Sequence, residues 1–135
     1  MSHPTGRLSA QTEIRVIFGD TDQMGIVYYA NYLRWFEASR GEFLRRAGLP
    51  YGEIERAGWG MPVIEAHVKY VRPARYEDLI RVTITVDEVK HASLRFRYEV
   101  TRDDEQLATG WTIHACVDKS GRAVRIPREV RELLV

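Results

Sequence analysis

The hydrophobic period of the chain changes once, near residue 60, and this change constrains the fold more than any other feature. Over residues 30–47 the apolar side chains recur at the spacing of an α-helix, whereas over residues 64–117 they alternate with polar ones, as in strands. A β-prone apolar stretch at residues 12–19 predicts one further strand before the helix. One strand, one long helix and then a run of strands is the order typical of an α+β fold.

The long predicted helix carries an apolar stripe and ends at a clear stop. Its inward-facing stripe consists of Tyr32, Phe36, Ser39, Phe43 and Ala47, with Leu33 and Leu44 beside it. Gly48 fits the C-cap of this helix, and Pro50 prevents its continuation. A short helical segment is expected over residues 51–57, and Pro127 predicts the start of a brief C-terminal helix.

Four alternating segments between residues 64 and 117 predict four strands in succession. Their connections fall at residues 73–78, 90–92 and 103–105, and short connections between successive strands predict an antiparallel meander. Together with the first strand, they predict a five-stranded antiparallel sheet with the long helix covering one face. One helix cannot protect both long edges of such a sheet, so we expect pairing with a second copy, most simply with C2 symmetry.

Length and composition bound the class of protein. At 135 residues the chain predicts a single domain over residues 1–135, in which residues 1–11 are polar and form a flexible tail. A net charge of +1 argues against a general nucleic-acid-binding protein, and no apolar run approaches the ~18 residues of a membrane span. The single Cys116 excludes an intrachain disulfide framework and no signal-peptide pattern is present, so a cytoplasmic location is expected.

The turn between the first strand and the long helix holds the residues best suited to chemistry. Asp20 and Asp22 lie there, close to the free backbone N–H groups and the positive dipole end of the helix. A carboxylate in this position can attack a polarised carbonyl or activate water beside it. Both aspartates can instead serve only the turn, an interpretation that applies first to Asp20. A phosphoryl-transfer site is disfavoured, because that chemistry needs a parallel sheet of alternating strands and helices.

The same turn carries a family resemblance. The pattern Asp-x-Asp-x-x-Gly-Ile-Val-x-x-x-Asn-Tyr at residues 20–32, followed by a helix ending in Ala-Gly-Leu-Pro, resembles the 4-hydroxybenzoyl-CoA thioesterase family of hotdog-fold acyl-CoA thioesterases. The resemblance continues through residues 60–64, 72–78 and 125–127, and so spans nearly the whole chain from about residue 13. It implies a hotdog fold, in which a five-stranded antiparallel sheet wraps around one long helix, and hydrolysis of the thioester of a small acyl-CoA.

The resemblance also implies roles for individual residues of the turn. Asp22 matches the catalytic aspartate of the family, as a nucleophile or as a general base, and the sequence leaves both roles open. A backbone N–H near Tyr29 is expected to bind the developing oxyanion. Gly25 and Asn31 complete the expected substrate-binding turn. Tyr29 stands where many relatives have a histidine, which leaves the chemistry to Asp22 and favours an aromatic acyl group.

Coenzyme A carries phosphates, so cations are expected where it binds. Family comparison points to the connection between the third and fourth strands, with Lys90, His91 and Ser93, although a solvated hairpin is an equal alternative. Arg72 and Arg75 are further candidates. The resemblance implies an acyl-CoA substrate, no cofactor, and a homodimer or a homotetramer built as a dimer of dimers, with the active sites at the dimer interface.

Two other functions suit the same fold. A non-catalytic acyl-CoA or acyl-carrier binding protein would have no chemical need of Asp22. A hotdog hydratase or dehydratase needs a histidine or acid paired across the acyl α- and β-carbons, and no histidine occupies this turn. Metal chemistry is not expected, because His67 and His114 have no second ligand at metal spacing.

Overall fold

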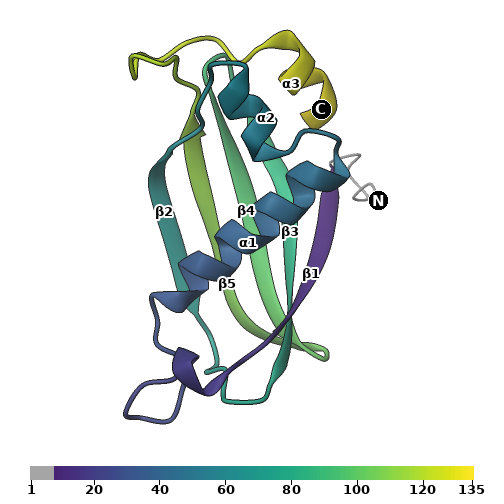
Figure 1. The fold of residues 1–135 in the computed structure, drawn as a ribbon. Coiled ribbons are helices and arrows are strands. Elements are labelled where there is room, and N and C mark those ends of the chain that lie inside the picture. Colours follow the sequence, from purple (N-terminus) through teal and green to yellow (C-terminus); the bar gives the residue numbers. More distant parts are fainter. Residues whose placement is uncertain (1–7) are drawn as a thin grey trace.

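The structure is a computed structural model that describes residues 8–135, and it confirms the predicted α+β architecture. Its elements, in chain order, are β1 (Ser9–Arg15), a 3-10 turn (Phe18–Asp20), α1 (Asn31–Arg46), α2 (Tyr51–Arg56), β2 (Val63–Tyr70), β3 (Leu79–Val89), β4 (Ser93–Arg102), β5 (Glu105–Ala115) and α3 (Arg128–Leu134). The five strands form one antiparallel sheet that curves around α1 (Figure 1). Within residues 8–135, no helix is long and apolar enough to cross a membrane.

The order of the strands corrects the predicted four-strand meander. The order is β1-β3-β4-β5-β2, so only β3, β4 and β5 follow one another as hairpins, and β2 pairs with β5 rather than with β3. The connection between β2 and β3 crosses the end of the sheet instead of turning back. Its backbone binds β5 at one end, where Val71 N–H donates to Leu107 O at 2.8 Å, and the β1 side at the other, where Val16 N–H donates to Asp78 O at 2.8 Å.

The buried face of α1 agrees with the predicted stripe at most positions. Its buried residues are Tyr32, Trp35, Phe36, Ser39, Phe43 and Leu44, whereas the side chain of Leu33 is 41% exposed. Trp35 was not predicted, although it follows Tyr32 by three residues, a spacing that places both side chains on the same face of a helix. The predicted stop is confirmed: Gly48 has a φ of 83°, and Leu49 N–H donates to Leu44 O at 2.8 Å, as in a Schellman motif.

The helix approaches the sheet closely because β5 carries a glycine below it. The Phe36 ring stacks on the Tyr98 ring with centroids 4.1 Å apart and lies over Gly110. A Cβ at position 110 would meet Phe36 Cε2 at 2.8 Å and the carbonyl oxygen of His67 at 2.4 Å. Gly110 is therefore required for both the seating of α1 and the pairing of β5 with β2.

The two edge strands differ in what they expose. β1 begins at Ser9, and its residues 9–11 pair with β3, so these three residues do not belong to a flexible tail, contrary to the prediction. Residues 1–7 of the predicted tail lie outside the described part of the chain. β2 is exposed over most of its length, including the apolar side chains of Val63 and Ile64, the latter 56% exposed. A single copy of the chain therefore leaves an apolar strand edge open, the situation that usually calls for a partner strand.

We expect the substitution Gly110→Ala to lower the free energy of unfolding by about 3 kcal/mol, the upper end for overpacking, because the added methyl group clashes with backbone as well as with Phe36. The measurement is urea unfolding at fixed protein concentration. Gly52→Ala in α2 is the matched control, since its Cβ would lie 3.8 Å from the end of Arg56 and alanine favours the helix. Equal stability of the two variants would show that the close approach of α1 is not needed.

Candidate active site

The loop formed by residues 21–27 presents the Asp22 carboxylate at the end of the sheet. Its two ends are joined by a β-bridge, and inside it Asp22 N–H donates to Ile26 O at 2.9 Å. Gly25, with a φ of 79°, provides the left-handed turn that closes the loop. The Asp22 carboxylate is half-buried, and among residues 8–135 it accepts one hydrogen bond, from Met24 N–H at 2.9 Å. Within this part of the chain, its remaining lone pairs are free for a substrate or a water molecule.

Asp20 supports this loop from a buried position. Its carboxylate is buried and accepts hydrogen bonds from Ile17 N–H at 3.1 Å and from the Arg34 guanidinium at 3.2 Å. Its carbonyl accepts two more, from Tyr28 N–H at 2.9 Å and from the Asn31 side-chain amide at 2.8 Å. Asp20 thus serves the turn, and Asn31 ties the first residue of α1 to it.

Tyr29 follows the loop and precedes the first residue of α1. Its carbonyl accepts the Tyr70 hydroxyl at 2.7 Å, and its ring, 60% exposed, contacts the rings of Tyr28 and Tyr70. Within the described part of the chain, the Tyr29 N–H has no acceptor. This amide lies just before the N-terminus of α1, where the helix dipole adds to its attraction for negative charge.

The connection between β2 and β3 packs against the loop and brings one cation to it. The carbonyl of Ala74 accepts Val27 N–H at 2.9 Å. Of the two arginines of this connection, Arg72 forms an ion pair with Glu105 at 3.2 Å, whereas the exposed Arg75 side chain has no ion pair among residues 8–135. Within the described part of the chain, Arg75 is therefore a cation near the loop whose charge is not paired.

The structure does not bring Lys90, His91 and Ser93 to Asp22. These residues form the β3–β4 hairpin, while the Asp22 loop lies at the opposite end of the sheet, beside the start of β3 (Figure 1). The eleven residues of β3 separate the two by roughly 30–35 Å, from the rise of about 3.3 Å per residue in a strand. Within one copy of the chain, the hairpin and Asp22 cannot hold the same part of a ligand.

The hairpin is instead tied to the C-terminal segment. Lys90 N–H donates to Ser93 O at 2.8 Å, and the carbonyl of His91 accepts Ile126 N–H at 2.9 Å. The Arg131 guanidinium of α3 donates to the carbonyl of Lys90. These contacts fix the hairpin in place but leave the Lys90 ammonium exposed, with only a loose ion pair to Glu88 at 3.8 Å.

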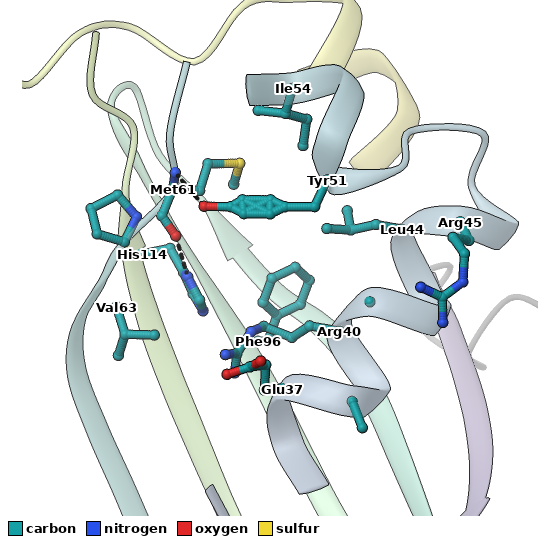
Figure 2. Close-up of a pocket in the computed structure, with 13 residues that line it drawn as sticks. Glu37, Arg40, Leu44, Arg45, Tyr51, Ile54, Met61, Val63, Phe96 and His114 are labelled. Atoms are coloured by element: carbon teal, nitrogen blue, oxygen red, sulfur yellow. Dashed lines mark hydrogen bonds between the residues drawn. The ribbon is translucent and has the colours of Figure 1, made fainter. Parts of the chain in front are cut away.

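A pocket of about 590 Å³, which the sequence did not predict, lies at the same end of the molecule as the hairpin. It opens between α1, α2 and the start of β2 (Figure 2). Its apolar lining includes Leu44, Ile54, Met61, Val63 and Phe96. Glu37 and Arg40 add charged groups from α1, and His114 adds a ring from β5. Charged residues beside an apolar helical stripe usually face solvent, so the sequence held no sign of this role.

A continuous chain of hydrogen bonds crosses the core below this pocket. Arg40 lies 3.0 Å from the Tyr98 hydroxyl, which lies 2.6 Å from Thr112 Oγ1; this atom is 2.9 Å from His114 Nε2, and His114 Nδ1 is 3.0 Å from Met61 O. A guanidinium can only donate and a carbonyl oxygen can only accept, so the two ends of the chain set the direction of every hydrogen bond in it. The Tyr98 hydroxyl accepts from Arg40 and donates to Thr112, and the Thr112 hydroxyl donates to His114 Nε2. The Nδ1–H group of His114 then donates to the carbonyl of Met61. Burial lowers the pKa of His114 to about 4, in keeping with a neutral ring.

These features define the class of the protein, which has the predicted hotdog architecture. Its five-stranded antiparallel sheet curves around one long helix, and a turn with two aspartates precedes the start of that helix. A sequence model described as the Thioesterase-like superfamily matches residues 16–134. The chain belongs to this family of hotdog thioesterases, and the resemblance to 4-hydroxybenzoyl-CoA thioesterases is confirmed. The protein is a thioester hydrolase.

Similar proteins cover almost the whole chain. The acyl-CoA thioesterase YbgC of Haemophilus influenzae is 33% identical over 120 residues, which cover 87% of this chain and 88% of that protein. The 4-hydroxybenzoyl-CoA thioesterase of Pseudomonas sp. is 32% identical over 130 residues, covering 88% and 92%. A crystal structure of a 4-hydroxybenzoyl CoA thioesterase mutant complexed with 4-hydroxybenzoyl CoA has a TM-score of 0.87 at 26% identity, covering 94% of this chain and 99% of that one.

The buried ring of His114 predicts a loss of stability in acid. Its pKa in the folded protein, about 4, lies below the ordinary value of about 6.5, so the unfolded chain takes up the proton first as the pH falls. The stabilisation is complete above about pH 6.5 and declines as the pH falls toward 4. Between about pH 7.5 and about pH 5 it should decrease by about 2 kcal/mol.

The test compares urea unfolding of the wild-type protein and of His114→Gln at both pH values. We expect the wild-type protein to lose about 2 kcal/mol more than this variant, because glutamine does not titrate. His67→Gln, which removes an exposed histidine of β2, should retain the wild-type pH dependence. Identical losses in the wild-type protein and His114→Gln would contradict the assignment of a neutral, buried imidazole.

Proposed function

We propose that this protein hydrolyses a small acyl-CoA and that Asp22 is the catalytic carboxylate. The observation that carries the proposal is the placement of the Asp22 carboxylate, with free lone pairs, in the loop that leads to the unpaired Tyr29 N–H at the start of α1. A thioester carbonyl bound to this N–H would have its oxygen at a donor and its carbon open to the loop. Removal of one such donor typically slows an enzyme by about 10²–10³.

Asp22 can act in two ways from this position. As a nucleophile it attacks the thioester carbon, coenzyme A leaves as the thiolate, and water hydrolyses the mixed anhydride to the free acid. As a general base it takes a proton from a water molecule, whose oxygen attacks the same carbon and expels the same thiolate. In both routes the oxyanion forms at the Tyr29 N–H, so the proposal covers both.

A homodimer paired along β2 would complete this site. Antiparallel pairing of β2 with a second copy places Tyr70, at the end of one strand, beside Val63, at the start of the other. Tyr70 binds the Tyr29 carbonyl, and Val63 lines the pocket. Each Asp22 loop would thus face the pocket of the other copy, with the 90–93 hairpin of that copy at the same end, and a tetramer could form from two such dimers.

An aromatic acyl group suits the rings around the loop. The Tyr29 ring contacts the rings of both Tyr28 and Tyr70, and all three residues are at least 45% exposed. Aromatic faces and edges of this kind favour another ring. We propose that Tyr29 contacts the acyl group and that Arg75, together with Lys90, His91 and Ser93 of the second copy, attracts the phosphates of coenzyme A.

The decisive experiment removes the charge of Asp22 and keeps its size. We expect Asp22→Asn to lower kcat by at least about 10³ against the best ester of a panel of benzoyl-, 4-hydroxybenzoyl-, acetyl-, hexanoyl- and palmitoyl-CoA, while binding is retained. Asp104→Asn, in the exposed β4–β5 turn, is the matched control. Substantial turnover by Asp22→Asn would show that another group is catalytic. Binding without hydrolysis by the wild-type protein would instead indicate an acyl-CoA binding protein.

The dimer is tested at its exposed edge. We expect Ile64→Asp to shift the protein to a monomer in sedimentation velocity and to remove most of the thioesterase activity, because it places a charge near each end of the proposed strand pairing, where an exposed apolar side chain would otherwise be covered. Leu133→Asp changes an apolar residue of similar size, 37% exposed on α3, and should keep both the dimer and the activity. A fully active monomer of Ile64→Asp would rule out a shared site.

A further inference from the structure

Arg40 and Arg45 both line the pocket between α1 and β2, and Arg45 is in an ion pair at 2.8 Å, whereas Arg40 is held in place but only partly satisfied. Arg40 has five N–H donors, and within the described part of the chain its guanidinium donates one hydrogen bond, to the neutral Tyr98 hydroxyl at 3.0 Å. Among residues 8–135 it forms no ion pair, although Glu37 lines the same pocket one turn earlier on α1. By contrast, Arg46 on the same helix is paired with Glu42 at 3.2 Å.

The position of Arg40 is fixed from below. The chain of hydrogen bonds through Tyr98 and Thr112 ends at His114, whose ring is buried and anchored to the carbonyl of Met61. Every member of this chain has its donor and acceptor used, so the Tyr98 hydroxyl can only accept from Arg40. A donor group held in this way binds a ligand without first losing side-chain freedom, which increases its contribution to affinity.

The surroundings of Arg40 define the ligand. Much of the remaining lining, with Leu44, Ile54 and Phe96, is apolar and suits a hydrocarbon chain or an aromatic ring (Figure 2). The free N–H groups of a guanidinium match the two oxygens of a carboxylate, with which they form paired, charge-assisted hydrogen bonds. A molecule with an apolar body and an anionic end would satisfy both parts of the pocket.

We infer that Arg40 is a specificity-determining residue that binds a carboxylate at the far end of the acyl group. This inference rests on the proposed function, in which the acyl group of a thioester bound at the Asp22 loop of one copy extends into the pocket of the other. The preferred substrates are then acyl groups with a terminal carboxylate, aliphatic or aromatic. Glu37 opposes them through its like charge, and its exposed side chain can turn into solvent.

The test uses pairs of esters that differ only at the far end of the acyl group: adipyl-CoA with hexanoyl-CoA, and 4-carboxybenzoyl-CoA with 4-methylbenzoyl-CoA. The wild-type enzyme should show the higher kcat/KM for the carboxylated member of the better pair. Arg40→Met should lower that value about tenfold or more and change the uncharged member by less than about threefold. Arg40→Lys, which keeps the charge but loses the fork, should fall between the two.

Two control variants separate local binding from net charge. Arg46→Met removes the same charge from the same helix outside the pocket and should leave the ratio unchanged. Glu37→Gln should raise kcat/KM for the carboxylated ester, because it removes the opposing charge. An unchanged ratio in Arg40→Met, or a wild-type preference for the uncharged members of both pairs, would overturn the inference and leave the thioesterase proposal standing.

The inference can also be tested if no ester is hydrolysed, a result that would refute the proposed function alone. Calorimetric titration with monomethyl adipate and with methyl hexanoate then measures the pocket directly. We expect the wild-type protein to bind the carboxylated probe at least about tenfold more tightly than Arg40→Met does. Equal affinity of the two proteins for this probe would overturn the inference.

Discussion

The packing of Phe36 onto the sheet is the contact on which the rest of this structure depends. Its ring stacks on Tyr98 and lies over Gly110, the position of β5 where any side chain would clash. The helix is therefore held against the concave face at its centre, and both of its ends are positioned by the same contact. The N-terminus of α1 stays beside the Asp22 loop, and its C-terminal half forms a wall of the pocket.

The two aspartates of the turn differ in what surrounds their carboxylates. Asp20 is buried, paired with Arg34 and bonded through its carbonyl to Asn31, so that it joins the turn to the helix. Asp22 lies outside these contacts, in a loop that Gly25 closes, and its carboxylate remains accessible. In the proposed mechanism Asp22 is the catalytic carboxylate, and Asp20 helps to hold the turn that presents it. The spacing Asp-x-Asp does not distinguish these two roles, whereas the folded turn does.

Features that depend on neighbours in the chain were predictable, and those that depend on distant residues were not. The bounds of α1 and the turn with Asp22 follow from local patterns, the apolar stripe and the stop at Gly48. The strand order does not, because the crossing of the β2–β3 connection is decided by its bonds to residues far away in the sequence, such as Leu107. The pocket is of the same kind, since the hydrogen bonds that hold Arg40 join four segments of the chain.

The parts of the proposed site are separated within one copy of the chain, along the open edge strand β2. The loop with Asp22 lies where β2 ends, whereas the pocket and the 90–93 hairpin lie where β2 begins. In the proposed dimer, antiparallel pairing along β2 reverses one copy, so each loop would meet the pocket and the hairpin that lie at the far end of its own chain. In a single copy of the chain, Val63 and Ile64 are exposed on an unpaired edge strand, and such an edge favours aggregation. In the proposed pair, the same residues form the contact that brings a carboxylate to an acyl group bound by the other copy.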